Sequence, residues 1–122
     1  MTKKKPTGIV RIIKAAGYSM AGMKAAWKHE AAFRQEVFAL AVLLPLGFFL
    51  GRNGIERAML ISSVMIVLVT ELLNSALEAL VDRTGLEYHP LAKQTKDMGS
   101  AAVFVSIAIV VIVWILILSG RY

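Results

Sequence analysis

A polar run interrupts one of the most apolar parts of this 122-residue chain. Its polar side chains recur at spacings of three and four, which puts them on one face of an α-helix: Glu71, Asn74, Ser75, Glu78 and Asp82. Residues 58–70, directly upstream, carry no charge, so the carboxylates enter a membrane-like segment. A charged side chain there costs about 2.5–3.5 kcal/mol on insertion scales. These five residues, the acidic face, therefore predict a functional site.

A second acidic element lies earlier in the sequence. Glu30 and Arg34 are four residues apart and are expected to pair along a helix face. If the helix after Glu30 packs antiparallel to the one that carries Glu78, these two carboxylates lie at similar depth. Such a pair suits Mg²⁺, which commonly binds one or two carboxylates together with nucleotide phosphates. Glu71, about 16 Å deeper than Asp82 at ~1.5 Å per residue, is then placed to accept a proton from a hydroxyl. The pattern suits phosphoryl transfer.

Each of these features also has a purely structural alternative. The acidic face could be a polar zipper between helices, and Glu30 with Arg34 an ordinary ion pair. The other charged candidates suit lipid-headgroup contacts, loop positions or a helix cap: Arg11, Lys14, Glu87, His89, Lys96 and Asp97. The sequence contains no P-loop, no glycine-rich kinase loop and no HExxH metal motif. The residues alone therefore leave a kinase and a transporter open.

The composition indicates a membrane protein of one domain, residues 1–122. Hydrophobic residues make up 57% of the chain, well above an ordinary soluble domain. The chain has no cysteine, which excludes disulfides and thiolate metal sites. The net charge of +6 comes from basic residues that flank apolar segments, which indicates a membrane surface and no nucleic-acid partner. Lysine and arginine interrupt the N-terminal segment, so we do not expect a cleavable signal peptide.

The apolar runs predict an all-α fold with one surface helix and three transmembrane helices. Residues 7–28 alternate apolar and basic positions at helical spacing, as in an amphipathic helix that lies in the membrane interface. The predicted transmembrane helices cover residues 31–50, 56–81 and 97–119, and residues 101–118 carry no charge. Residues 51–54 are expected to form a tight turn, and residues 84–95 a polar loop.

The distribution of positive charge predicts the orientation. Eleven of the 14 lysines and arginines lie in the N-terminal segment, at the start of the first span or near the 84–95 loop. The other three lie on the opposite side: Arg52, Arg57 and Arg121. The positive-inside rule therefore places the N-terminus, the loop and the acidic face on the cytoplasmic side.

Several stretches resemble the bacterial integral membrane diacylglycerol kinases. They are RIIKAAGYS from Arg11, AAWKHEAAFRQE from Ala25, LISSVM from Leu60, ELLNSALEALVDR from Glu71, EYH from Glu87 and KDMGSAAV from Lys96. They follow in order from the surface helix to the third span. The chain departs from the family pattern at Pro45, at Pro90 and in its lysine-rich N-terminus. Of these, Pro90 lies in the loop that the resemblance assigns to the nucleotide, where it would alter how the nucleotide is held.

The resemblance implies a homotrimer in the bacterial inner membrane that transfers the γ-phosphate of MgATP to diacylglycerol during phospholipid recycling. It makes Glu71 the proton acceptor and assigns Glu30 and Glu78 to Mg²⁺. It implies nucleotide contacts at Arg11, Tyr18, Glu30, Glu78, Glu87, His89, Lys96 and Asp97. It implies lipid contacts at Arg11, Ala15, Ser19, Lys24, Trp27, Ala32, Arg34, Gln35, Glu36, Glu71 and Ser100. Supporting roles fall to Lys14, Asn74, Ser75 and Asp82.

Two other functions rank below this one. An undecaprenol kinase shares the core of the acidic motif, but RIIKAAGYS and AAFRQE match the diacylglycerol enzymes more closely. An ion-coupled transporter or channel subunit would also use intramembrane acids. Transporter sites tend to lie at the bilayer midplane between inverted repeats, whereas these acids extend to one surface and the sequence shows no repeat.

Overall fold

The computed structural model describes residues 4–5, 7–85 and 87–120, and all of their regular secondary structure is helical. The helices are α1 (Gly8–His29), α2 (Ala31–Leu50), α3 (Gly54–Arg83) and α4 (Pro90–Ser119). The last three are long and apolar enough to cross a membrane. The predicted all-α architecture is therefore confirmed. Lys3 and Arg121, two of the basic residues used for the orientation, lie outside the described residues.

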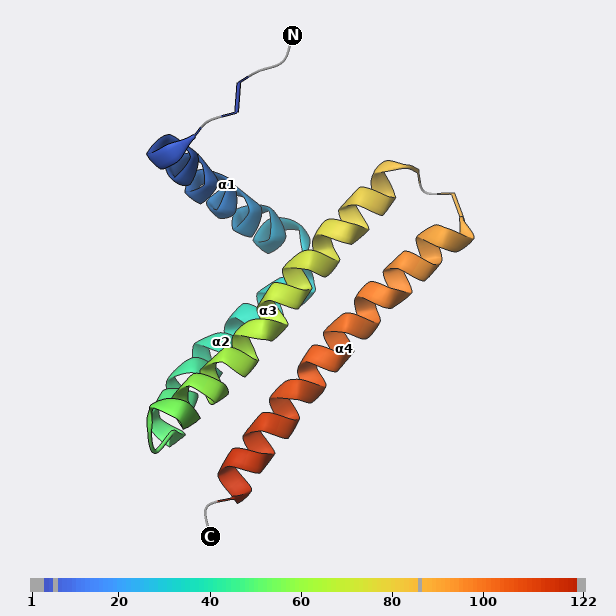
Figure 1. Ribbon diagram of the computed structural model, residues 1–122. Helices are drawn as coiled ribbons and strands as arrows, with labels where there is room; N and C mark the ends of the chain where they lie inside the picture. Colours follow the sequence, from blue (N-terminus) through green and yellow to red (C-terminus); the bar gives the residue numbers. More distant parts are fainter. Residues whose placement is uncertain (1–3, 6, 86, 121–122) are drawn as a thin grey trace.

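α3 is the central helix of the molecule. It packs against α2 and α4, whereas α1 contacts α2 and α3 and leaves the bundle at an angle (Figure 1). α1 and the connection between α3 and α4 lie at one end of the bundle, and the α2–α3 turn lies at the other (Figure 1). The chain order thus brings the Glu30 region and the polar end of α3 to the same end.

The chain turns between α2 and α3 where a tight turn was predicted, and polar contacts fix this turn. The Asn53 side chain caps α3 by accepting a hydrogen bond from the Glu56 backbone N–H at 2.9 Å. Glu56 Oε1 in turn accepts from the Arg52 backbone N–H at 3.0 Å. Arg57 donates from Nε to the Phe48 carbonyl oxygen at 3.0 Å and lies over the Phe48 ring. These contacts set where α2 ends and α3 begins.

The chain between α1 and α2 breaks at Glu30, and this corrects the predicted Glu30–Arg34 ion pair. Glu30 has an extended backbone, so it is not in one continuous helix with Arg34. The structure places no ion pair between these two described residues. Arg34 Nη1 donates instead to the Trp27 carbonyl oxygen at 2.6 Å and to that of Lys28 at 3.4 Å. It thereby satisfies carbonyls that the end of α1 leaves without helical partners.

The last helix begins earlier than predicted, at Pro90 instead of residue 97. Proline suits the first turn of a helix because its missing N–H needs no partner there. His89 caps this end, where its Nδ1 accepts from the Leu91 N–H at 3.1 Å. Asp97 is therefore inside the helix and does not cap it; it forms an ion pair with Lys93 at 2.7 Å.

Small residues let the three long helices approach closely. Gly47 of α2 is buried, and a Cβ there would lie 3.3 Å from Leu60 Cβ and 3.5 Å from the Trp114 ring. Trp114 Nε1 donates to the Leu60 carbonyl oxygen at 3.3 Å, which joins α4 to α3. Nearer the other end of α4, Gly99 is buried directly against the Asn74 side chain. Such small-residue contacts are typical of helix packing in membranes.

Candidate active site

The acidic face becomes steadily more buried from its end toward the middle of α3. Asp82 is exposed, Glu78 and Ser75 are half-buried, Asn74 is 9% exposed and Glu71 only 4% exposed. Ser75 Oγ donates a hydrogen bond to Glu71 Oε1 at 3.4 Å. The predicted proton acceptor is therefore a buried carboxylate with one hydroxyl partner.

Three other carboxylates lie within electrostatic range of Glu71. Glu78 of α3, Glu30 at the α1–α2 junction and Glu36 of α2 all interact electrostatically with it. These are like charges, so they repel one another unless a proton or a cation compensates them. Both predicted metal ligands therefore lie within electrostatic range of the predicted base.

The two predicted metal ligands, Glu30 and Glu78, suit a metal ion that takes most of its ligands from phosphates and water. Within the described residues, no three Asp, Glu or His side chains gather as a complete metal site. Mg²⁺ needs only one or two carboxylates when phosphates and water supply the rest. Glu30 and Glu78 are chemically suited to that role.

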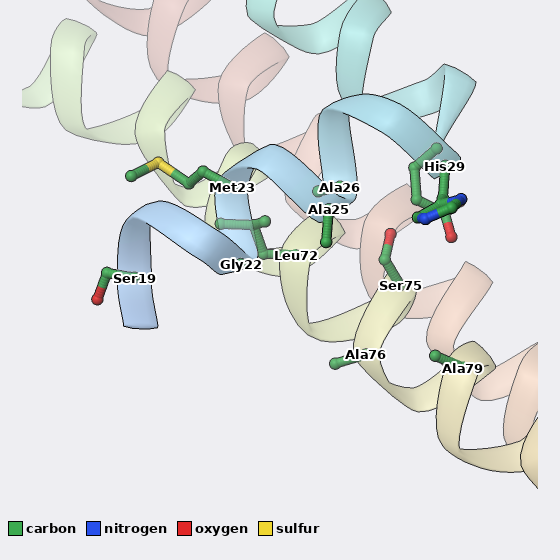
Figure 2. A pocket seen from close by; sticks show the side chains of 11 residues that line it. Ser19, Gly22, Met23, Ala25, Ala26, His29, Leu72, Ser75, Ala76 and Ala79 are labelled. Atoms are coloured by element: carbon green, nitrogen blue, oxygen red, sulfur yellow. The ribbon is translucent and has the colours of Figure 1, made fainter. Parts of the chain in front are cut away.

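A cavity of about 600 Å³ lies between α1 and α3. We call it the α1–α3 cavity, and Figure 2 shows the residues that line it. α1 contributes small and apolar residues such as Gly22, Met23 and Ala25, and α3 contributes Leu72, Ala76 and Ala79. The polar lining residues are Ser19, His29, Glu30 and Ser75. Ser19 lies at one end of the cavity, and His29 and Ser75 lie toward the other (Figure 2).

A second hollow, of about 270 Å³, lies beneath the connection between α3 and α4. We call it the loop pocket, and its charged or polar lining residues are Asp82, Glu87, Tyr88, His89, Lys93, Lys96 and Asp97. It therefore unites four of the predicted nucleotide contacts. His89 Nδ1 accepts the hydrogen bond that caps α4, so in its neutral form Nε2 carries the proton.

The remaining predicted residues are dispersed over the surface of the single chain. Five lie exposed along α1: Arg11, Lys14, Ala15, Tyr18 and Lys24. Neither Arg11 nor Tyr18 lines the loop pocket, and the first turn of α1 lies apart from that connection (Figure 1). Ala32, Gln35 and Ser100 are also exposed. Trp27 packs against Phe38 with ring centroids 5.8 Å apart.

Several features of the site had no signal in the sequence. Asp82 pairs with Lys96 at 2.7 Å across the α3–α4 connection. Glu36 Oε2 and Asn74 Oδ1 are buried without a hydrogen-bond partner among the described residues. His29 lines the α1–α3 cavity, although only its position beside Glu30 in the sequence could have indicated this. Each of these contacts depends on how the helices are rotated against one another.

Comparison with known proteins identifies the family. The family model for prokaryotic diacylglycerol kinase matches residues 17–118. A diacylglycerol kinase of Escherichia coli K12 is 54% identical over 116 residues, which are 95% of both chains. Those of Pseudomonas aeruginosa and Haemophilus influenzae are 52% and 51% identical, over at least 90% of each chain. The chain therefore belongs to the prokaryotic diacylglycerol kinase family.

Proposed function

We propose that this protein is a lipid kinase that transfers the γ-phosphate of MgATP to the hydroxyl of diacylglycerol and so forms phosphatidic acid. Its relatives at 51–54% identity are named diacylglycerol kinases. The observation that carries the proposal is the buried Glu71 carboxylate, hydrogen-bonded to Ser75, which itself lines the α1–α3 cavity. A hydroxyl held in that cavity would contact Ser75, whose own hydroxyl is hydrogen-bonded to the carboxylate that would take the proton.

The α1–α3 cavity suits the lipid substrate. Its walls are formed mainly by alanine, glycine, leucine and methionine residues, which suit an acyl chain. Ser19, Glu30 and Ser75 also line it, and they could form hydrogen bonds with a glycerol backbone. Phosphoryl transfer depends mostly on positioning and electrostatic stabilisation. The cavity supplies the positioning.

The carboxylates divide the remaining work. Glu71 accepts the proton as the lipid oxygen bonds to the γ-phosphorus and the bond to the ADP oxygen breaks, with Ser75 orienting the carboxylate. Glu30 and Glu78 would hold Mg²⁺, which when bound neutralises charge on the phosphates. The loop pocket, with Glu87, His89, Lys96 and Asp97, holds the nucleotide. Within one chain, Arg11 and Tyr18 do not line the loop pocket. They would reach the nucleotide only if α1 moved or if another protomer supplied the pocket.

We further propose a homotrimer in the bacterial inner membrane, with the N-terminus and the site on the cytoplasmic side. In the most apolar stretch of α4 only 6% of the residues are buried within one chain, and in that of α2 17% are buried. These faces are left to lipid and to neighbouring protomers. The excess of lysine and arginine at the α1 end supports the orientation.

Purified protein in detergent–lipid mixed micelles tests the function. Labelled ATP is supplied with diacylglycerol, with undecaprenol or with neither, and the lipid product is quantified. We expect labelled phosphatidic acid, dependence on Mg²⁺, and almost no product from undecaprenol. Phosphorylation of undecaprenol at a higher kcat/KM than diacylglycerol would overturn the assigned substrate.

A further inference from the structure

The ion pair between Asp82 and Lys96 links the last turn of α3 to the second turn of α4. Asp82 Oδ1 and Lys96 Nζ are 2.7 Å apart, and the side chains are 50% and 44% exposed. Glu78, one turn earlier on α3, also attracts Lys96. Lys96 is thus drawn toward α3 from two successive turns of the acidic face.

This ion pair lies at the loop pocket. Asp82 and Lys96 both line it, together with Glu87, His89 and Asp97. The other lysine of the pocket, Lys93, is already paired with Asp97 at 2.7 Å. The pocket therefore contains a cation whose position is fixed by the opposite helix.

The flexibility of a lysine side chain makes this ion pair relevant to ligand binding. The ammonium group has three N–H donors on a flexible stem, and ordering that stem costs conformational entropy. One bond to Asp82 orders the stem before a ligand arrives and leaves two donors for phosphate oxygens. A binding group that is already ordered binds more tightly, because less entropy is lost on association.

We propose that Asp82 is a positioning residue that holds Lys96 Nζ at the loop pocket for the phosphates of the nucleotide. This inference rests on the proposed kinase function, and Asp82 acts only through Lys96. If the ion pair only joined α3 to α4, its loss would lower the stability of the protein and would weaken binding of ATP and of the lipid alike. If Asp82 instead competed with the nucleotide phosphates for Lys96, removing the Asp82 carboxylate would tighten nucleotide binding.

The test compares Asp82→Ala and Asp82→Asn with Arg83→Gln, an exposed neighbour outside the loop pocket. The measurements are KM for ATP, KM for diacylglycerol, kcat, the Kd of a non-hydrolysable ATP analogue with Mg²⁺, and Tm in detergent. We expect Asp82→Ala to raise KM for ATP and the analogue Kd about fivefold, the upper range for a partly exposed ion pair. KM for the lipid and the Tm should stay near those of Arg83→Gln, and Asp82→Asn should fall between.

A double-mutant cycle with Lys96→Met provides the decisive comparison. In that background Asp82→Ala should have no further effect on the analogue Kd. An equal effect in both backgrounds, an unchanged or tighter Kd, or a parallel loss of Tm and lipid affinity overturns the proposal. Each of those results leaves wild-type lipid phosphorylation intact, so it is distinguishable from failure of the proposed function, in which wild-type protein makes no phosphatidic acid.

Discussion

The glutamates of the proposed site differ in burial, and this difference matches the separate roles proposed for them. Glu71 is 4% exposed and hydrogen-bonded to Ser75, whereas Glu78 is half-buried and Glu30 lies at a break between helices. Carboxylates in different environments can serve as base and as metal ligand within one site. Substitution by glutamine keeps the shape of each side chain and removes its charge, so it distinguishes these roles.

We predict that Glu71→Gln lowers kcat by about 10²–10⁴-fold, the range typical of a lost general base, with nucleotide affinity close to wild type. Rapid-quench kinetics and equilibrium binding of an ATP analogue measure the two quantities. If Glu71→Gln lost nucleotide binding but kept its turnover at saturating ATP, the roles of Glu71 and Glu78 would have to be exchanged.

Glu78→Gln and Glu30→Gln should instead weaken binding of the metal–nucleotide complex and raise the Mg²⁺ concentration needed for half-maximal activity. A Mg²⁺ titration at fixed ATP measures this shift. Glu56→Gln is the matched control, because it makes the same chemical change at the α2–α3 turn, at the other end of the bundle. A Glu78→Gln protein with wild-type kinetics and Mg²⁺ dependence would rule out the metal assignment.

At the scale of elements, α3 positions the site because both of its neighbours pack closely on it. Gly99 of α4 is buried against Asn74, and a Cβ at Gly99 would overlap the Asn74 side-chain oxygen. Asn74 lies between Glu71 and Glu78 on the acidic face. The distance between α3 and α4 at the site therefore depends on the absence of a side chain at residue 99.

Gly99→Ala should destabilise the fold by about 1–3 kcal/mol, the usual cost of overpacking, and should reduce activity because Asn74 has to move. Thermal unfolding in detergent and kcat measure the two effects. Gly17→Ala is the control, since a Cβ there meets nothing within 4 Å. Equal stability of the two variants would show that the contact with Asn74 is loose.

At the scale of the whole molecule, one chain does not gather all the residues of the proposed site. Arg11 and Tyr18 are exposed on α1 and lie outside the loop pocket, while most of α4 is uncovered. A polar site in a membrane is costly where lipid reaches it. Both observations suit the proposed oligomer, in which neighbouring protomers would share residues of each site.

Sharing between protomers predicts complementation. Glu30→Gln and Asp97→Asn, each assayed at a Mg²⁺ concentration at which it has lost most of its activity alone, should recover a fraction of wild-type activity when they are mixed and allowed to exchange protomers. Differently tagged chains, purified in sequence, confirm that mixed oligomers have formed. Absence of recovery in such oligomers would indicate that Glu30 and Asp97 serve one site within a single chain.

The sequence by itself determined what depends on local spacing. Helical periodicity placed Glu71, Asn74, Ser75 and Glu78 on one face, and the apolar runs predicted three helices able to span a membrane, which the structure confirms. The ordered motifs also predicted the family, which the comparisons confirm. The roles of individual site residues stay predictions.

The tertiary structure decided every contact between residues distant in the chain. It paired Asp82 with Lys96, brought Glu36 close to Glu71 and set Gly99 against Asn74. It also corrected two local predictions, because the backbone breaks at Glu30 and His89 caps a helix that begins at Pro90. Periodicity fixes the face on which a side chain lies. The rotation and separation of packed helices decide which faces meet, and these follow from close packing along the whole interface.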